Sequence, residues 1–155
     1  MLPPAPYHLR AMQLTDLKAV SAIDRLAYPT PTRASLFRHE LSENKMAHYQ
    51  VLEIGSQIIG FAGYWLIGDE VHVSTIAIHP DWRGRYLGEL LFLNILLAAY
   101  EHPACLVTLE VRRSNTVAQA LYQKYDLAIV GERRGYYRDT GEDAILMTVT
   151  PLDGR

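Results

Sequence analysis

Hydrophobic and polar positions in the first part of the chain predict one strand followed by two helices. Tyr7 to Gln13 is expected to form the strand, and apolar residues at helical spacing follow Thr15, which we expect to be an N-cap. Pro29 and Pro31 end this helix, because proline lacks a backbone N–H and restricts the residue before it. Ser35 to Asn44 is expected to form a second, short helix.

The hydrophobic period changes in the middle of the chain, where three β-rich runs are joined by short turns. Tyr49 to Ile54 and Gln57 to Ile67 flank Gly55-Ser56, a favourable two-residue hairpin connection. Val71 to Ile78 follows a second turn at Gly68-Asp69. These runs predict an antiparallel meander of three strands.

Helical and strand patterns alternate in the second half of the chain. Leu87 to Tyr100 is apolar almost all round, which predicts a helix covered on several sides, and Cys105 to Val111 is a strand of the buried type. Asn115 precedes another helix, and two strands are expected near Ala128–Arg133 and Ala144–Val149. The predicted order, β-α-α-β-β-β-α-β-α-β-β, describes a mixed α/β (α+β) sheet with a βαβ crossover. Such units usually bind ligands at the carboxyl ends of their strands.

Composition narrows the class of protein. The length of 155 residues fits one ordinary domain, and we expect a short tail at 1–6, a domain at 7–150 and a second tail at 151–155. The net charge of −2 supplies no general attraction to nucleic acid or anionic membranes.

Leu90 to Ala99 is too short to span a bilayer, and no signal peptide is recognisable, so we expect a cytoplasmic protein. With Cys105 as the one cysteine and no ligand spacing among the histidines, we expect no metal.

The loop between the strand ending at Ile78 and the helix beginning near Leu87 is a candidate anion site. It reads Arg83-Gly84-Arg85-Tyr86-Leu87-Gly88. The first N–H groups of a helix have no partner within it, and the helix dipole adds about half a positive charge there. The alternative is that the arginines are solvated surface residues and the glycines serve turn geometry.

This loop resembles the acetyl-CoA pyrophosphate loop of the GNAT acetyltransferases, whose pattern is Q/R-x-x-G-x-G/A. Further segments resemble the RimI-type ribosomal-protein-alanine N-acetyltransferases within that family. They are Leu109-Glu110-Val111-Arg112-Arg113-Ser114-Asn115, Ala120-Leu121-Tyr122, Arg133-Arg134-Gly135-Tyr136-Tyr137 and Asp139-Thr140-Gly141-Glu142-Asp143-Ala144. The resemblance runs from about Val73 to Val149 and implies a GNAT fold with a central splayed sheet.

The resemblance also implies which residues bind acetyl-CoA and the acceptor. The cofactor-binding residues are Ile76, Ala77, Ile78, Arg83, Gly84, Arg85, Tyr86, Leu87, Gly88, Glu89 and Asn115. The residues of the acceptor site are Tyr28, Tyr136 and Tyr137. Asn115 has two expected duties, because asparagine also suits the helix N-cap.

Two positions depart from the family pattern. Tyr86 stands where the pattern has its central glycine, and its side chain either narrows the pyrophosphate cradle or lies outward and leaves the backbone amides available. In Tyr28-Pro29-Thr30-Pro31-Thr32, Pro29 is followed by Thr30, whereas RimI-like relatives usually have an aromatic residue after the proline. That loop borders the acceptor site in the family.

Acyl transfer from a thioester to an amine requires a proton acceptor, oxyanion stabilisation and a proton for the leaving thiolate. Glu110 lies late in an otherwise apolar strand; alternatively, it ends the strand at the surface and pairs with an arginine such as Arg112 or Arg113. Tyr122 lies on the apolar stripe of its helix; alternatively, it is a core tyrosine like Tyr125. The resemblance implies that Glu110 is the proton acceptor and Tyr122 the proton donor.

The expected function is therefore acetyl-CoA-dependent N-acetylation by direct transfer. The resemblance implies the α-amino group of a protein N-terminus as acceptor, with the N-terminal alanine of a ribosomal protein as the implied case. A free α-amino group has a pKa of about 8 and needs modest base assistance at pH 7. Two alternatives remain: a GNAT enzyme for a small amine or lysine, and a catalytically weak acyl-CoA-binding module. A backbone N–H of the strand ending at Ile78 is the expected oxyanion donor, and we expect no nucleic-acid or membrane partner.

Overall fold

The computed structural model describes residues 6–28, 32, 34–102 and 104–150, and these residues build a seven-stranded mixed sheet with helices on both faces. Residues 1–5 and 151–155, which make up nearly all of the two expected tails, lie outside the described residues, as do Pro29 and Pro31.

The first half of the chain forms a meander with two helices between its first and second strands. The elements are β1 (Tyr7–Ala11), α1 (Leu17–Ala27), α2 (Ala34–Ser42), β2 (Ala47–Ile54), β3 (Gln57–Ile67) and β4 (Glu70–Ile78). Successive strands pair antiparallel, which confirms the predicted meander and adds β1 to it.

The expectation that Thr15 caps the first helix is wrong. Thr15 lies inside a 3-10 turn, Leu14–Asp16, and Asp16 is the N-cap of α1. The Asp16 carboxylate accepts a hydrogen bond from the Gln13 N–H at 2.8 Å and pairs with Arg10 at 2.8 Å. These contacts tie the start of the helix to β1, and no spacing in the sequence indicated them.

The second half of the chain forms the crossover and the far edge of the sheet. Its elements are α3 (Leu87–Glu101), β5 (Leu106–Arg112), α4 (Thr116–Lys124), β6 (Ala128–Tyr137) and β7 (Glu142–Val149). The sheet order is β1-β2-β3-β4-β5-β7-β6, and β4 pairs parallel with β5, as the predicted βαβ crossover requires. β6 extends four residues beyond its predicted end at Arg133, because it bulges against β7 and continues to Tyr137.

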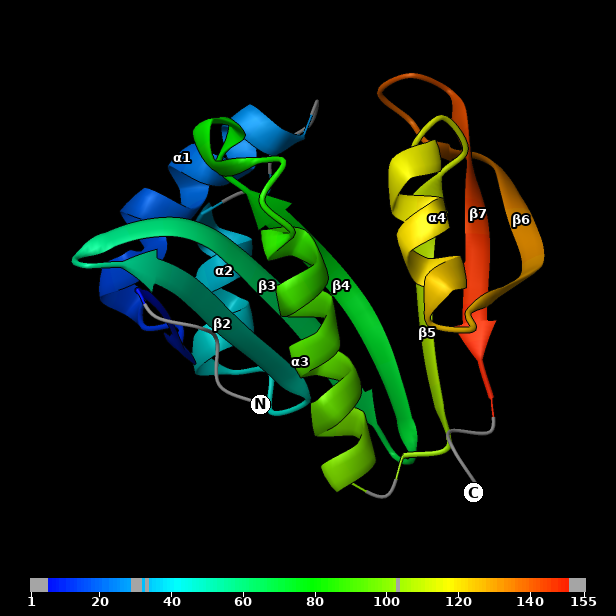
Figure 1. Ribbon diagram of the computed structural model, residues 1–155, viewed down its shortest axis with the longest axis horizontal. Helices are drawn as coiled ribbons and strands as arrows, with labels where there is room; N and C mark the ends of the chain where they lie inside the picture. Colours follow the sequence, from blue (N-terminus) through cyan, green and yellow to red (C-terminus); the bar gives the residue numbers. More distant parts are fainter. Residues whose placement is uncertain (1–5, 29–31, 33, 103, 151–155) are drawn as a thin grey trace.

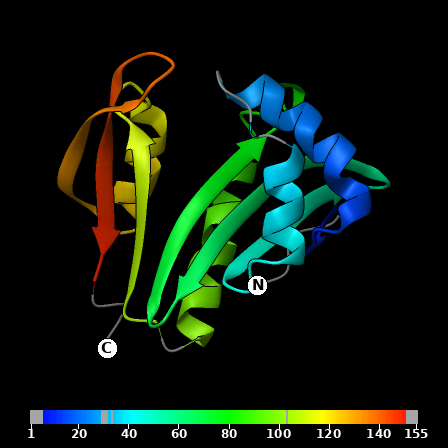
Figure 2. The ribbon, with the colours of Figure 1, turned by 180° about the vertical axis from the view of Figure 1, so that it is seen from behind.

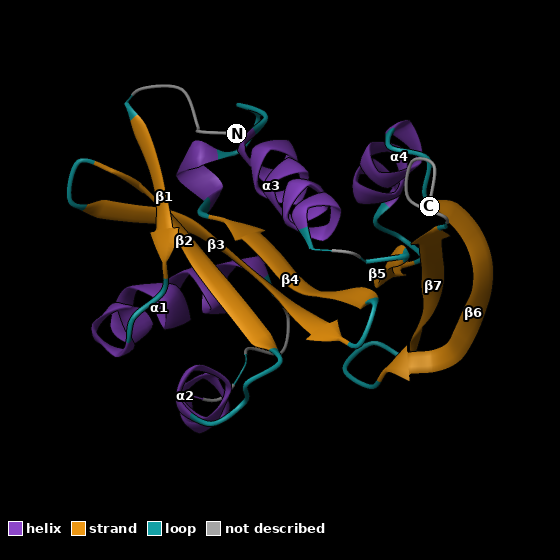
Figure 3. Ribbon diagram, turned by 90° about the horizontal axis from the view of Figure 1, so that it is seen from below, coloured by secondary structure: helices purple, strands orange, loops and turns teal. Residues whose placement is uncertain are grey.

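Two apolar layers hold the helices on the sheet. Figures 1 and 3 show α3 and α4 on one face, and Figure 2 shows α1 and α2 on the other. α3 fully buries one broad face, which includes Leu91, Phe92 and Ile95, whereas Leu90 and Leu93 on its other side are partly buried, so the helix is covered less evenly than its apolar pattern predicts. On the opposite face, Val20 and Phe37 belong to a second buried cluster.

The sheet opens between β4 and β5. Only residues Glu70–His72 of β4 pair with β5, where their partners are Leu106–Thr108. Beyond these residues the two strands diverge (Figure 1). The register between β3 and β4 shifts so that Ser74 is an extra residue between the partners of Gly63 and Tyr64. Such a bulge bends a strand and increases its twist, which turns the end of β4 away from β5.

Candidate functional site

A cavity of about 1710 Å³ occupies the wedge between β4 and β5. The residues that line it belong to both halves of the sheet, the starts of α3 and α4, the β6–β7 hairpin and α2. The predicted site residues that line it are Tyr28, Ile76, Ala77, Ile78, Arg83, Gly84, Tyr86, Leu87, Gly88, Glu89, Glu110, Asn115, Tyr122, Tyr136 and Tyr137. Arg85 does not line it, because its guanidinium lies over the Trp82 ring at 4.7 Å.

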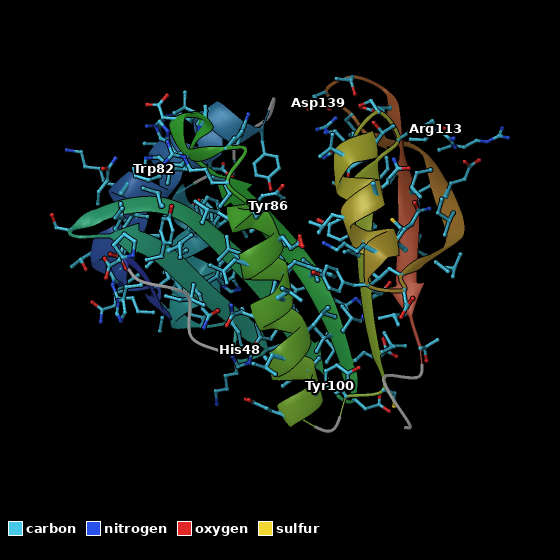
Figure 4. The ribbon with its side chains drawn as sticks, viewed as in Figure 1. His48, Trp82, Tyr86, Tyr100, Arg113 and Asp139 are labelled. Atoms are coloured by element: carbon cyan, nitrogen blue, oxygen red, sulfur yellow. The ribbon has the colours of Figure 1, made fainter. Side chains whose placement is uncertain are left out.

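The loop before α3 adopts a backbone that suits an anion. Gly84 has φ of 79°, and Tyr86 is the N-cap of α3 in the left-handed region, with φ of 61° and ψ of 21°. The glycine of the family pattern is replaced here by tyrosine, yet the backbone adopts the left-handed conformation that favours glycine. The Tyr86 side chain is 82% exposed and stands at the start of α3 beside the opening (Figure 4). The ring therefore lies at the open rim of the cavity that it helps to line, and it is not packed over the N–H groups at the start of the helix.

Tyr86→Gly tests this arrangement of the loop. Tyrosine in the left-handed region is strained by about 1 kcal/mol or more, so the variant is expected to gain up to about 1 kcal/mol in the free energy of unfolding. Because the ring is solvent-exposed at the rim of the cavity, the Kd for acetyl-CoA should change by no more than a few-fold. Urea unfolding and calorimetry measure the two quantities.

Asp126→Gly is the matched control for Tyr86→Gly. Asp126 also has a positive φ, of 68°, and it follows α4, outside the cavity lining. Asp126→Gly should show a similar gain in the free energy of unfolding, with an unchanged Kd for acetyl-CoA. A tenfold tighter Kd for Tyr86→Gly alone would mean that the ring obstructs the cradle.

The edge of β4 that faces the cavity offers free backbone positions. Beyond His72, β4 has no β5 partner in the described sheet, although its other edge stays paired with β3 up to Ile78. N–H groups that would complete a parallel ladder are thus directed toward the cavity. Two carbonyls of this stretch are already occupied, because Ile76 accepts a hydrogen bond from the Tyr28 hydroxyl and Ile78 accepts one from the Arg83 Nε. An N–H here as oxyanion donor remains a prediction.

Glu110 presents a carboxylate to the cavity from β5. Its Oε1 lies 3.6 Å from the Nε of Arg133, and its buried Oε2 has no hydrogen-bond partner among the described residues. The alternative pairing with Arg112 or Arg113 is wrong, because those guanidiniums pair with Asp139 and Glu132. A buried, unpaired carboxylate oxygen is costly unless a ligand supplies its partner.

Tyr122 faces the same cavity from α4. Its ring packs edge-on against Phe92, with 4.9 Å between centroids. Burial raises the pKa of Tyr122, and the nearby Tyr28 and Tyr137 raise it further, so the phenol stays protonated. Tyr122 is therefore both packed and cavity-facing, unlike Tyr125, whose hydroxyl donates to Glu89 at 2.9 Å.

Asn115 is the N-cap of α4, as predicted. Its side-chain oxygen accepts a hydrogen bond from the Ala118 N–H at 3.1 Å. Because Asn115 also lines the cavity, its side-chain amide is available for a second contact there.

Three tyrosines, Tyr28 beside β4 and Tyr136 and Tyr137 at the end of β6, form the tyrosine wall of the cavity. The Tyr28 hydroxyl donates to the Ile76 carbonyl at 2.7 Å and lies 2.8 Å from the Thr75 hydroxyl, which fixes it on β4. Hydrogen bonding to the nearby Glu110 carboxylate raises the pKa of Tyr136, and burial raises the pKa of Tyr137 to about 12. All three side chains are therefore neutral hydrogen-bonding groups near neutral pH.

Arg112 holds the tyrosine wall in place, a role that the sequence did not indicate. Its guanidinium donates two hydrogen bonds to Asp139, at 2.8 and 3.1 Å, and lies 4.0 Å above the Tyr137 ring. This joins the end of β5 to the β6–β7 hairpin, whose Asp139 is labelled in Figure 4. A forked cation that also stacks on a ring restrains the hairpin in a way that lysine does not reproduce.

Across the described ranges, no group of three or more His, Cys, Asp or Glu residues is arranged to hold a metal ion. Among the described helices, none combines the length and apolar character needed to cross a membrane.

Comparisons with known proteins agree with this architecture. Residues 14–126 match the Acetyltransferase (GNAT) family. A crystal structure of the ribosomal-protein-S18-alanine N-acetyltransferase from Escherichia coli superimposes with a TM-score of 0.87 at 26% identity, covering 96% of each chain. The expected GNAT fold with its mixed sheet is confirmed.

Sequence relatives point to the same family. A Bacillus subtilis protein, provisionally named ribosomal protein bS18-alanine N-acetyltransferase, is 41% identical over 142 residues, or 92% of this chain and 94% of its own length. The N-alpha-acetyltransferase RimI of Mycobacterium tuberculosis is 36% identical over 76% of this chain and 74% of its own length. The family match and these relatives together show that the chain belongs to the GNAT acetyltransferases, enzymes that use acetyl-CoA.

Proposed function

We propose that this enzyme acetylates the α-amino group of a protein N-terminus, and that the acceptor is the N-terminal alanine of a ribosomal protein, as named for the Bacillus subtilis relative and the Escherichia coli structure. The observation that carries the proposal is the unpaired, buried oxygen of Glu110, a residue that lines the same cavity as Tyr122. We place the activity in one domain over residues 7–150 and in the cytoplasm, where ribosomal proteins are made.

The residues present fit acetyl-CoA. The left-handed loop, the open space at Gly84 and the start of α3 form a cradle of backbone donors for a diphosphate. A Cβ at Gly88 would reach only the Ile78 side chain, at 4.0 Å, so the first turn of α3 leaves room beside β4. Arg83 adds positive charge to the cavity wall. Acetyl-CoA supplies the acetyl group as a thioester.

Proton transfers at two side chains then account for the chemistry. Glu110 accepts a proton from the acceptor nitrogen as that nitrogen bonds to the acetyl carbon. The Tyr122 hydroxyl donates a proton to the sulfur as the carbon–sulfur bond breaks. The free backbone edge of β4 supplies an N–H to the carbonyl oxygen while it carries negative charge. Tyr28, Tyr136 and Tyr137 hold the acceptor chain against this centre.

A comparison of acceptors tests the proposal. An alanine-starting peptide should be acetylated once, at its α-amino group, whereas the same peptide with a blocked N-terminus and an internal lysine should not react. Mass spectrometry locates the modification, and calorimetry measures acetyl-CoA binding separately. Acetylation of the blocked peptide or of free polyamines alone would assign the enzyme to lysine or small amines. Binding of acetyl-CoA without turnover of any acceptor would leave only a binding module.

A further inference from the structure

Glu40 is a buried carboxylate that lines the cavity, which neither of the other two buried carboxylates of the described chain does. Asp16, Asp24 and Glu40 are each less than 10% exposed. Asp16 pairs with Arg10, and Asp24 accepts the backbone N–H of Thr32 in the loop after α1. No lysine, arginine or histidine nitrogen forms an ion pair with Glu40 among the described residues.

Neutral groups hold the Glu40 carboxylate in position. Its Oε1 accepts hydrogen bonds from the Trp65 indole N–H at 2.7 Å and the Tyr49 hydroxyl at 3.1 Å. Its Oε2 accepts one from the Asn44 amide at 2.6 Å. Burial chiefly, with Glu40 contributing, raises the pKa of Tyr49 to about 12, so this partner remains a neutral donor. The arrangement fixes the carboxylate without neutralising it.

Gly63 makes this arrangement possible. A Cβ at Gly63 would lie 2.3 Å from the Tyr49 ring, so the ring crosses β3 where no other residue leaves room. The Tyr49 hydroxyl lies within 3.4 Å of the Ser74 hydroxyl at the β4 bulge. The network is thus built into the sheet beside the point where β4 turns away from β5.

The network lines the acceptor side of the cavity. Glu40, Tyr49, Trp65 and Ser74 all contribute to the cavity wall. Ser74 is followed by Thr75, whose hydroxyl contacts Tyr28. These residues therefore connect Glu40 to Tyr28, and Tyr28 in turn raises the pKa of Tyr122.

A buried carboxylate without a countercharge carries an electrostatic cost that a cationic ligand would relieve. The attraction is strengthened by the low dielectric of the site and weakened little by salt. The aromatic rings of Trp65 and Tyr49 beside the carboxylate also suit a cation with an apolar stem.

We propose that Glu40, framed by Tyr49 and Trp65, is a subsite for a second cationic group of the acceptor, an ammonium or guanidinium separate from the amine that is acetylated. The inference rests on the proposed function in that it places the acceptor in this cavity. In a peptide, this cation is the side chain of a residue that follows the N-terminal one; in a polyamine, it is a second amine.

Matched peptides measure the effect. In alanine-starting peptides, arginine at the second or third position is compared with citrulline, which has the same shape without the charge. We expect the arginine peptide to have a kcat/KM about tenfold higher in the wild-type enzyme, since hydrogen bonds to charged groups are worth more than neutral ones. Glu40→Gln keeps an acceptor oxygen for Trp65 and Tyr49 but removes the charge, and should reduce the ratio to about one.

Glu43→Gln is the matched control. Glu43 follows α2, pairs with His39 on the surface and is 71% exposed, so the same loss of charge there should leave the tenfold ratio unchanged. An equal arginine preference in wild type and Glu40→Gln would overturn the subsite, as would a wild-type enzyme that acetylates both peptides equally well.

A binding measurement separates the subsite from the proposed function. Because the Trp65 indole donates to Glu40, the arginine peptide should change tryptophan emission, and Trp65→Phe should remove that change. If no peptide is acetylated but spermidine is, with the same dependence on Glu40, the subsite stands and the N-terminal function fails. If neither peptide nor spermidine alters the emission, the subsite is wrong.

Circular dichroism of Glu40→Gln checks its fold, and Tyr49→Phe, which retains the charge, should preserve the arginine preference if Glu40→Gln does not fold.

Discussion

Replacing Glu110 with glutamine is expected to lower kcat by about 10²–10⁴-fold, the usual contribution of a general base. The amide cannot accept the amine proton, although it fills the same space between β4 and β5. Tyr122→Phe should lower kcat through loss of the proton donor, and the double variant should have no measurable turnover. The Kd for acetyl-CoA should stay within a few-fold of wild type, because the loop and the start of α3 are unchanged. Steady-state kinetics and calorimetry provide the two measurements.

Glu132→Gln is the control for this loss of charge. Glu132 lies on β6, is 40% exposed and pairs with Arg113, outside the cavity lining. It should retain near-normal kcat. Undiminished turnover in the double variant would remove both residues from the mechanism.

The pH profile gives an independent check on Tyr122. A proton donor acts only below its pKa, and burial raises the pKa of Tyr122 above its ordinary value of about 10. Its deprotonation should therefore not reduce kcat at or below about pH 10. A falling limb between pH 7 and 9 that disappears in Tyr122→Phe would contradict this assignment.

Local patterns predict the frame of the site well. The β4-α3-β5 crossover follows from a change of hydrophobic period, and the cap at Asn115 follows from its residue type. Both depend on neighbours within a few residues along the chain. This is the scale on which propensity and periodicity carry information.

Contacts between distant segments could not be predicted in the same way. Glu110 lies beside Arg133 of β6, two strands away in the sheet, and not beside Arg112 or Arg113, the nearby arginines that the alternative interpretation named. Arg85 belongs to the predicted loop motif but stacks on Trp82 instead of lining the cavity. Sheet order and side-chain direction decide these cases, and neither is encoded in local spacing.

The residues around Glu40 are the clearest example of information that only the fold supplies. α2, β2, β3 and the β4 bulge each contribute one side chain to the network, and none belongs to a recognisable motif. An acidic residue at the end of a short amphipathic helix is ordinarily solvated. Here the packing of α2 on the sheet buries it against the cavity.

Phe92→Ala is expected to cost about 3–5 kcal/mol in the free energy of unfolding, as large-to-small changes in a fully buried aromatic usually do. Phe92 on α3 is 0% exposed, and its ring lies 4.9 Å from that of Tyr122 and 6.0 Å from that of Tyr125. It therefore supports α4 across the opening of the sheet, where β4 and β5 no longer pair. Urea unfolding measures the loss, and Phe92→Leu provides a milder variant that should remain folded.

The same ring also supports the proton donor, which separates a site effect from a general loss of stability. Phe61→Ala removes a ring of equal size from the other apolar cluster, where Phe61 packs on Phe37 and to which Tyr122 does not belong. Both alanine variants should lose similar stability, but at a temperature where each is folded only Phe92→Ala should show a marked fall in kcat. Equal kcat values for the two variants would mean that Tyr122 keeps its position without Phe92, and that β5 and the β6–β7 hairpin alone orient α4.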